Sequence, residues 1–195
     1  MCVRKNMFEM EIELENWSRT LLYCYRYLGK IVETIDDMVA KISIESMFYR
    51  KNSTNNTMAQ VEKILELNDR KVNLTNLKVI IEECVDKLPL KDMQLISLFY
   101  FDGLTFDEIA SVLGISRRTV FRRRNNAITH FKEELFKKVT FDYLMTNYAG
   151  EQWLIDFYNY SVKKYSQIEI FDENKSVDNG KYIYRTLKAL RKMAV

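Results

Sequence analysis

The most distinctive chemistry in this sequence is a run of basic side chains between Ser116 and Lys132. The segment SRRTVFRRRNNAITHFK holds five arginines and one lysine, and no aspartate or glutamate. The preceding residues, 102–115, carry three acids and no base. Guanidinium groups present planar forks of N–H donors, which pair with phosphate and with the O6 and N7 atoms of guanine. This distribution indicates that residues 116–132 contact a nucleic acid.

Signals for helix starts and stops surround this basic run. Thr105 is followed three residues later by Glu108, which is the spacing of a capping box. Gly114 can adopt the left-handed conformation that ends a helix, and Ser116 is a good N-cap for the next one. The first helix is expected to bury one face, formed by Ile109, Ala110, Val112 and Leu113.

Three residues of this segment have the types needed where two helices pack closely across one another. The crossing needs a small residue, Ala110, and the turn needs a glycine four residues later, Gly114. A branched apolar residue, Val120, then anchors the second helix, whose inner face continues through Ala127 and Phe131. The combination predicts a helix-turn-helix over residues 105–131 whose second helix, 116–132, reads the major groove.

The two kinds of DNA contact are assigned by the direction of each side chain. With Val120 inward and about 100° per residue, base-edge contacts are expected from Arg117, Arg118, Arg122 and Asn125. Phosphate contacts are expected from Thr105, Ser116, Thr119, Phe121, Arg123 and Arg124. The ring of Phe121 could also pack on a thymine methyl or a sugar.

The stretch VDKLPLKDMQLISLFYFDGLTFDEIASVLGISRRTVFRRRNNAITHF is similar to the fourth region of sigma-70 factors. The shared pattern comprises Leu88-Pro89, Leu95, Leu98, Tyr100, Gly103-Leu104-Thr105, Glu108-Ile109-Ala110, Leu113-Gly114-Ile115-Ser116 and Thr119-Val120. The resemblance implies helices near 76–87, 91–101, 106–113 and 116–134. It also implies base-edge contacts from Arg117, Arg118 and Arg122.

The segment SRRTVFRRRNNAI also resembles phage transcriptional activators of the RinA/ArpU type, whose layout residues 14–135 match. The expected function is therefore a sequence-specific DNA-binding transcription regulator of the phage-activator kind. One alternative is a divergent alternative sigma factor, which would need a polymerase-binding surface in residues 1–80. A second alternative is a helical interaction protein with a vestigial motif. Double-stranded DNA is the expected partner, and RNA polymerase is a second candidate.

A long helix is predicted over residues 7–42. Its apolar positions alternate steps of three and four at Leu14, Trp17, Leu21, Cys24, Leu28, Ile31, Ile35, Met38 and Ile42. Such a seam is typical of a coiled coil or a helical hairpin. It could join two copies in a homodimer through the 7–42 helix, or pack within one chain on the next helix. Trp17 is large for a tight two-stranded coil, which favours packing within the chain.

Polar segments, a proline and a glycine indicate where the other predicted helices begin and end. Residues 51–57 form a polar linker, and a second long helix should run to Lys87, before Pro89. Residues 136–165 are rich in aromatic side chains, with Gly150 separating two helices. A loop at 172–180 precedes a basic helix at 181–195. Three regions are expected, a long-helix region at 1–75, the DNA-binding domain at 76–135 and an aromatic-rich helical extension at 136–195.

Composition supports an all-α fold with a long N-terminal helical hairpin, a region 4-like helix-turn-helix and a small helical C-terminal extension. One proline and five glycines in 195 residues favour long helices. Three cysteines and one histidine supply no zinc-ligand pattern and no nucleophile–base pattern, so no metal, cofactor or enzymatic activity is expected. No apolar run predicts a membrane span, and the expected location is the cytoplasm of a bacterial or phage-infected cell.

Overall fold

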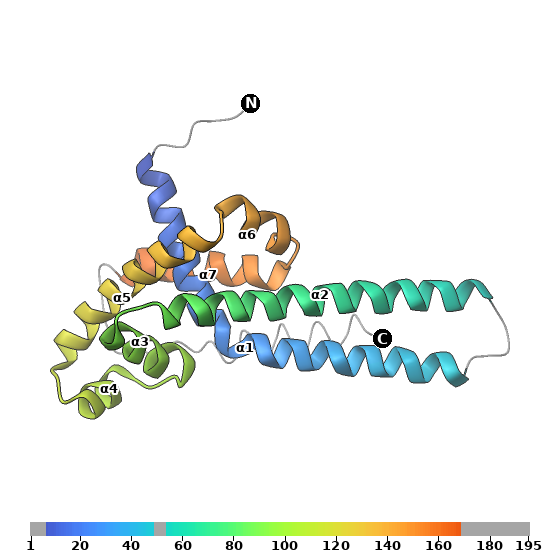
Figure 1. The fold of residues 1–195 in the computed structure, drawn as a ribbon, viewed down its shortest axis with the longest axis horizontal. Coiled ribbons are helices and arrows are strands. Elements are labelled where there is room, and N and C mark those ends of the chain that lie inside the picture. The colour runs from blue at the N-terminus through green and yellow to red at the C-terminus, as the bar shows by residue number, and fades with distance from the viewer. Residues whose placement is uncertain (1–6, 49–53, 169–195) are drawn as a thin grey trace. The chain divides into compact units, whose positions relative to one another are not determined.

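Helices make up all the secondary structure in the residues that the computed structural model describes, 7–48 and 54–168. In chain order they are α1 (Met7–Phe48), α2 (Thr54–Asp86), α3 (Leu90–Ile96), the π-helical turn η1 (Ser97–Phe101), α4 (Phe106–Leu113), α5 (Arg117–Lys138), α6 (Phe141–Tyr148) and α7 (Gln152–Ile168) (Figure 1). The predicted all-α class is confirmed for these residues. The expected loop at 172–180 and basic helix at 181–195 lie outside them.

Contacts divide the described residues into two compact units. Residues 7–26 and 79–168 form one unit, called here the helix-turn-helix unit. Residues 27–48 and 54–78 form the other, the hairpin unit. This division differs from the three consecutive regions expected from the sequence. The start of α1 and both C-terminal helices contribute to the same unit as the helix-turn-helix.

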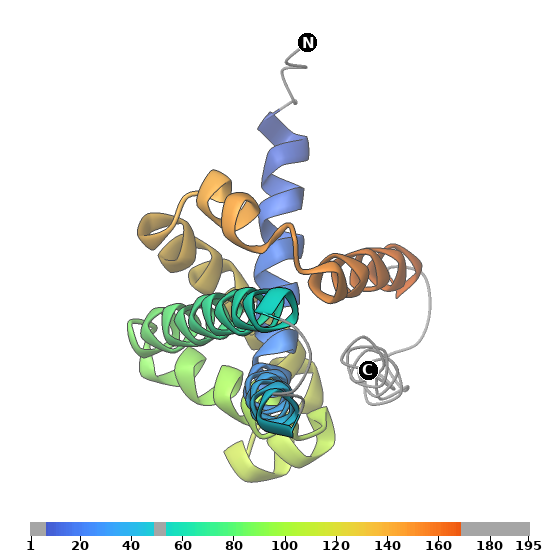
Figure 2. The ribbon, with the colours of Figure 1, turned by 90° about the vertical axis from the view of Figure 1, so that its right-hand side faces the viewer.

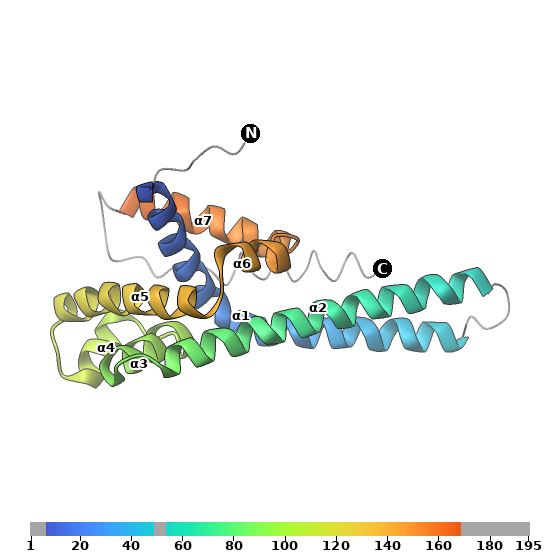
Figure 3. The same ribbon diagram turned by 45° about the horizontal axis from the view of Figure 1, so that its top comes forward.

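The hairpin unit pairs α1 and α2, which lie side by side in opposite directions (Figures 1 and 3). The buried apolar residues are Leu28, Ile31, Ile35, Met38 and Ile42 from α1 and Leu67, Leu74 and Leu77 from α2. An ion pair between Lys71 and Asp36, 2.5 Å long, joins the two helices at the surface. The seam predicted for α1 is therefore buried within one chain. The alternative of a homodimer through the 7–42 helix is not supported, because its side chains already have partners.

Aromatic side chains hold the start of α1 in the helix-turn-helix unit, between α7 on one side and α5 with α6 on the other (Figure 2). Trp17 is buried and stacks on Tyr158 of α7, with ring centroids 4.6 Å apart. The hydroxyls of Thr20 and Ser161 share a buried hydrogen bond of 3.0 Å. The aromatic-rich extension is therefore part of a core, and Gly150 lies in the turn between α6 and α7, as predicted.

A tight connection leads from η1 to α4. The backbone N–H of Asp102 donates to the carbonyl of Ser97, and that of Leu104 donates to the carbonyl of Leu98, both at 2.9 Å. Between them Gly103 has φ +76°, a conformation that favours glycine. The guanidinium of Arg26 lies against it, and a Cβ at this position would come within 2.2 Å of Arg26 Nη1.

Two glycine substitutions should have opposite effects on stability. Gly103→Ala should lower the free energy of unfolding by about 1–2 kcal/mol, because alanine is strained at positive φ. Gly29→Ala should raise it by roughly 0.5–1 kcal/mol, because Gly29 lies inside α1 with nothing within 4 Å of its added Cβ. Urea unfolding followed by circular dichroism measures both. Equal stability of Gly103→Ala and the parent protein would contradict the account of this turn.

Candidate nucleic-acid interface

A small apolar core joins the helices of the predicted DNA-binding motif. Leu95 of α3, Ile109 of α4 and Val120 of α5 are completely buried at its centre. The partly buried side chains around them are Leu98, Phe99, Leu104, Phe106, Ala110, Leu113 and Ile115. Ala110 and Val120 thus have the packing roles predicted from the sequence. Val112 does not: it is 64% exposed and takes no part in this core.

The start of α4 has the predicted capping box. The Thr105 hydroxyl accepts a hydrogen bond from the N–H of Glu108 (3.3 Å), and the Glu108 carboxylate accepts one from the N–H of Thr105 (2.7 Å). The hydrogen bonds that the Glu108 carboxylate accepts from Thr105 lower the pKa of Glu108. The Thr105 O–H also donates to Glu108, at 2.8 Å. The one hydroxyl donor that Thr105 could offer a phosphate is therefore already used within the motif.

The turn between α4 and α5 is formed by Gly114 in the left-handed conformation, with φ 63° and ψ 33°. The N–H of Ile115 then donates to the carbonyl of Ala110 at 3.1 Å. Ser116 caps α5 by accepting from the N–H of Thr119 at 3.2 Å. The Ser116 and Thr119 hydroxyls share one further hydrogen bond of 2.8 Å, which leaves one O–H donor between them for a phosphate.

Two arginines have the exposure that a groove contact requires. Arg118 and Arg122 are exposed on α5, four residues apart and therefore on the same face. Arg123 is half-buried beside them. Within the described residues none of these three side chains forms an ion pair. Their charges are therefore not neutralised by the parts of the protein that the structure describes.

Arg117 has a partner inside the motif. Its Nη1 lies 3.6 Å from the Asp107 carboxylate of α4, and both side chains are partly exposed. A surface pair of this kind contributes about 0–1 kcal/mol. A base or phosphate that competes for Arg117 would therefore displace Asp107 at low cost, so the predicted base contact remains open to this side chain.

Arg124 does not have the phosphate-contact position predicted for it. Its side chain is only 6% exposed, and its guanidinium carbon lies 5.5, 5.2 and 5.1 Å from the ring centroids of Phe99, Phe106 and Phe121. Arg124 follows Val120 by one helical turn, so it points to the core rather than to the side of α5. This burial contradicts the predicted position of Arg124 on the side of α5, because a phosphate contact would require the guanidinium to leave the three rings.

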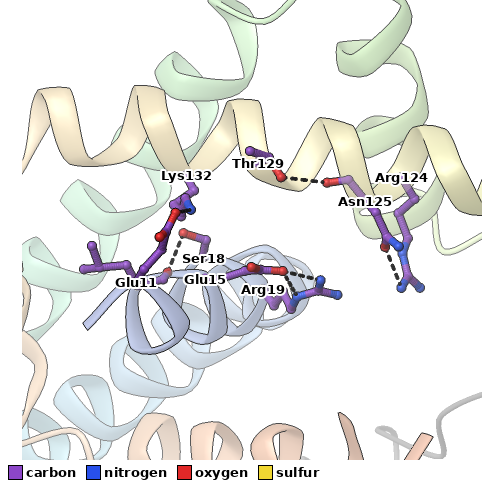
Figure 4. A network of polar contacts seen from close by, with 9 residues as sticks. Glu11, Glu15, Ser18, Arg19, Arg124, Asn125, Thr129 and Lys132 are labelled. Atoms are coloured by element: carbon purple, nitrogen blue, oxygen red, sulfur yellow. Dashed lines mark hydrogen bonds and ion pairs between the residues drawn. The ribbon is translucent and has the colours of Figure 1, made fainter. Parts of the chain in front are cut away.

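The neighbours of Arg124 are linked to it. Arg124 Nη2 donates to Asn125 Oδ1 at 3.3 Å (Figure 4). Asn125 is half-buried, and its amide N–H donors are not used by that bond. Phe121 is half-buried as well, with its ring tilted against Phe106 at 6.1 Å. These two residues lie at the border of the exposed face of α5, and the roles predicted for them stay predictions.

Polar contacts farther along α5 fix its second half. His130 pairs with Asp92 of α3 at 2.7 Å between Nδ1 and the carboxylate. Lys132 pairs with Glu11 of α1 at 3.2 Å (Figure 4), and Lys138 pairs with Glu83 of α2. Local sequence patterns could not predict these partners, because each is distant along the chain. The exposed arginines that lack ion pairs among the described residues therefore lie in the first turns of α5.

The geometry defines a helix-turn-helix with a basic second helix. Residues 78–131 match the family model described as sigma-70, region 4. The four helices implied by that resemblance correspond to the end of α2, α3 with η1, α4 and α5. No curated protein and no solved structure matches the chain. The resemblance to phage activators of the RinA/ArpU type is not confirmed. Among the described helices, none combines the length and apolar content of a membrane span.

Substitution of the buried arginine of α5 should affect stability more than substitution of an exposed one. Arg124→Ala should lower the free energy of unfolding by about 2 kcal/mol or more, because desolvated cation–π contacts and side-chain packing are both lost. Arg122→Ala should change it by less than about 0.5 kcal/mol, as is usual for exposed positions. Chemical denaturation of both variants provides the comparison. If the two variants had the same stability, Arg124 would not have the structural role described.

Proposed function

We propose that the chain is a sequence-specific DNA-binding transcription regulator of the phage-activator kind, which places the start of α5 in the major groove. The observation that carries this proposal is the exposed pair Arg118 and Arg122, whose charges have no partner among the described residues. Their guanidinium groups suit guanine edges, and Arg123 suits a phosphate. The N-terminus of α5 adds a partial positive charge next to the same surface. The proposal includes no catalytic step.

A divergent alternative sigma factor is the second candidate, and the match of residues 78–131 to sigma-70 region 4 favours it. The two candidates differ in what they require of RNA polymerase. A sigma factor should co-purify with the core enzyme and direct initiation at a specific promoter without another sigma factor. A regulator should bind its DNA site alone and require a sigma factor for initiation. Failure to retain any DNA at low salt would exclude both and favour an interaction protein.

Removal of either outward arginine should weaken binding to the preferred site. Genome-wide selection of bound fragments by the purified protein would first supply that site. Arg118→Ala or Arg122→Ala should then lose about 1–3 kcal/mol of discrimination at one base pair, because a bidentate base contact is removed. Lys41→Ala, which removes one exposed charge from α1 in the hairpin unit, is the control and should bind normally. Unchanged affinity and specificity in both arginine variants would refute the assignment.

Arg123 should behave as a phosphate contact rather than a base contact. Arg123→Ala should weaken binding about equally for all sequences, because the phosphate backbone is the same in each. The slope of log affinity against log salt should become less steep by about 1, since one fewer counterion is released. Titrations at several salt concentrations on a preferred and an unrelated duplex test this. A loss confined to the preferred duplex would make Arg123 a base-reading residue instead.

A further inference from the structure

The hydrogen bond between Arg124 and Asn125 fixes the direction of the Asn125 amide. Arg124 Nη2 donates to Asn125 Oδ1 at 3.3 Å (Figure 4). A guanidinium has donors only, so the amide atom that faces it must be the oxygen and not the nitrogen. The amide nitrogen therefore lies on the other branch of this planar group. No described residue accepts a hydrogen bond from its two N–H donors.

The burial of Arg124 makes this orientation of the amide costly to reverse. The Nε atom of Arg124 has no partner among the described residues. The bond to Asn125 is the one hydrogen bond that the described chain gives this guanidinium. A turn of the amide would remove that bond and leave a buried charge with aromatic contacts alone. We therefore expect Asn125 to keep this orientation when DNA binds.

Asn125 lies on the same side of α5 as the two exposed arginines. It follows Arg122 by three residues and Arg118 by seven, so the three side chains share one face of the helix. Asn125 is half-buried at the border of that face, whereas both arginines are exposed. The surface that carries the two unpaired charges therefore also carries an amide whose orientation is set from the core.

We propose that Arg124 is a positioning residue for base recognition: it holds the Asn125 amide so that Asn125 donates to an acceptor atom of a base edge. The bidentate pairing of asparagine with adenine needs the amide oxygen and nitrogen to face the base together. Guanine, with two adjacent acceptors, and thymine suit a donating amide better than adenine, whose acceptor lies beside an amino group. The inference rests on the proposed function, because it concerns the same DNA-reading surface.

Discrimination between base pairs tests whether the two residues act together. On the site selected by the parent protein, Asn125→Ala should lose about 2- to 10-fold discrimination at one base pair, as expected for one hydrogen bond. Arg124→Met, which fills the same space without a donor, should lose a similar factor at that pair and should have no further effect there in the Asn125→Ala background. Arg124→Lys, which restores a charged donor, should recover part of the loss. Asn76→Ala, at an exposed position of the hairpin unit, is the control and should discriminate normally.

Base analogues identify the atoms that the amide contacts, and they need only the parent protein and Asn125→Ala. At the pair that Asn125→Ala affects, purine in place of adenine, or 2-pyrimidinone in place of cytosine, removes the amino group. Binding by the two proteins should then weaken by the same factor, because the amide does not contact that group. Removal of the contacted acceptor, which is N7 or O6 of guanine or O4 of thymine, should weaken the parent protein about 2- to 10-fold more than Asn125→Ala.

Three results would overturn the proposal. The first is a loss specific to the parent protein when the amino group is removed. The second is an equal loss on all duplexes in Asn125→Ala, which would indicate a phosphate contact. The third is unchanged discrimination at the affected pair in folded Arg124→Met. Normal discrimination in Asn125→Ala, with altered discrimination in Arg118→Ala and Arg122→Ala, would refute this inference alone, whereas normal discrimination in all three would refute the proposed function as well.

Discussion

The buried guanidinium of Arg124 is the interaction on which the geometry of the helix-turn-helix depends. It lies among three phenylalanine rings, one each from η1, α4 and α5, so a single side chain contacts all three elements. Burial of an arginine is costly, and Nε of Arg124 has no hydrogen-bond partner among the described residues. The ring faces and the bond to Asn125 offset that cost. The angle between α4 and α5 is thereby fixed around a charged centre.

The five arginines of α5 consequently have different tasks, although they look equivalent in the sequence. Arg124 points into the motif, and Arg117 joins α5 to α4 through Asp107. Arg118 and Arg122 are exposed, and no described residue neutralises their charges. Helix periodicity alone decides this division, because residues one turn apart share a face and residues two apart do not.

The local features of the motif could be predicted from the sequence, whereas the features that depend on distant contacts could not. The caps at Thr105 and Ser116 and the turn at Gly114 were predictable, because each rests on one or two neighbouring residues. The burial of Arg124 was predictable in principle, since it follows Val120 by four residues; its charge argued for the surface. The stacking of Trp17 on Tyr158 was not predictable, because no local pattern joins α1 to α7.

Arginine-specific chemical modification, read by mass spectrometry with and without the selected DNA fragment, can distinguish the buried arginine of α5 from the exposed ones. In the DNA-unbound protein Arg118 and Arg122 should react readily and Arg124 should not. Addition of the DNA should protect Arg118 and Arg122 and leave Arg124 unchanged. Reaction of Arg124 in the folded protein, or full reactivity of Arg118 and Arg122 in the complex, would contradict this division of roles among the arginines.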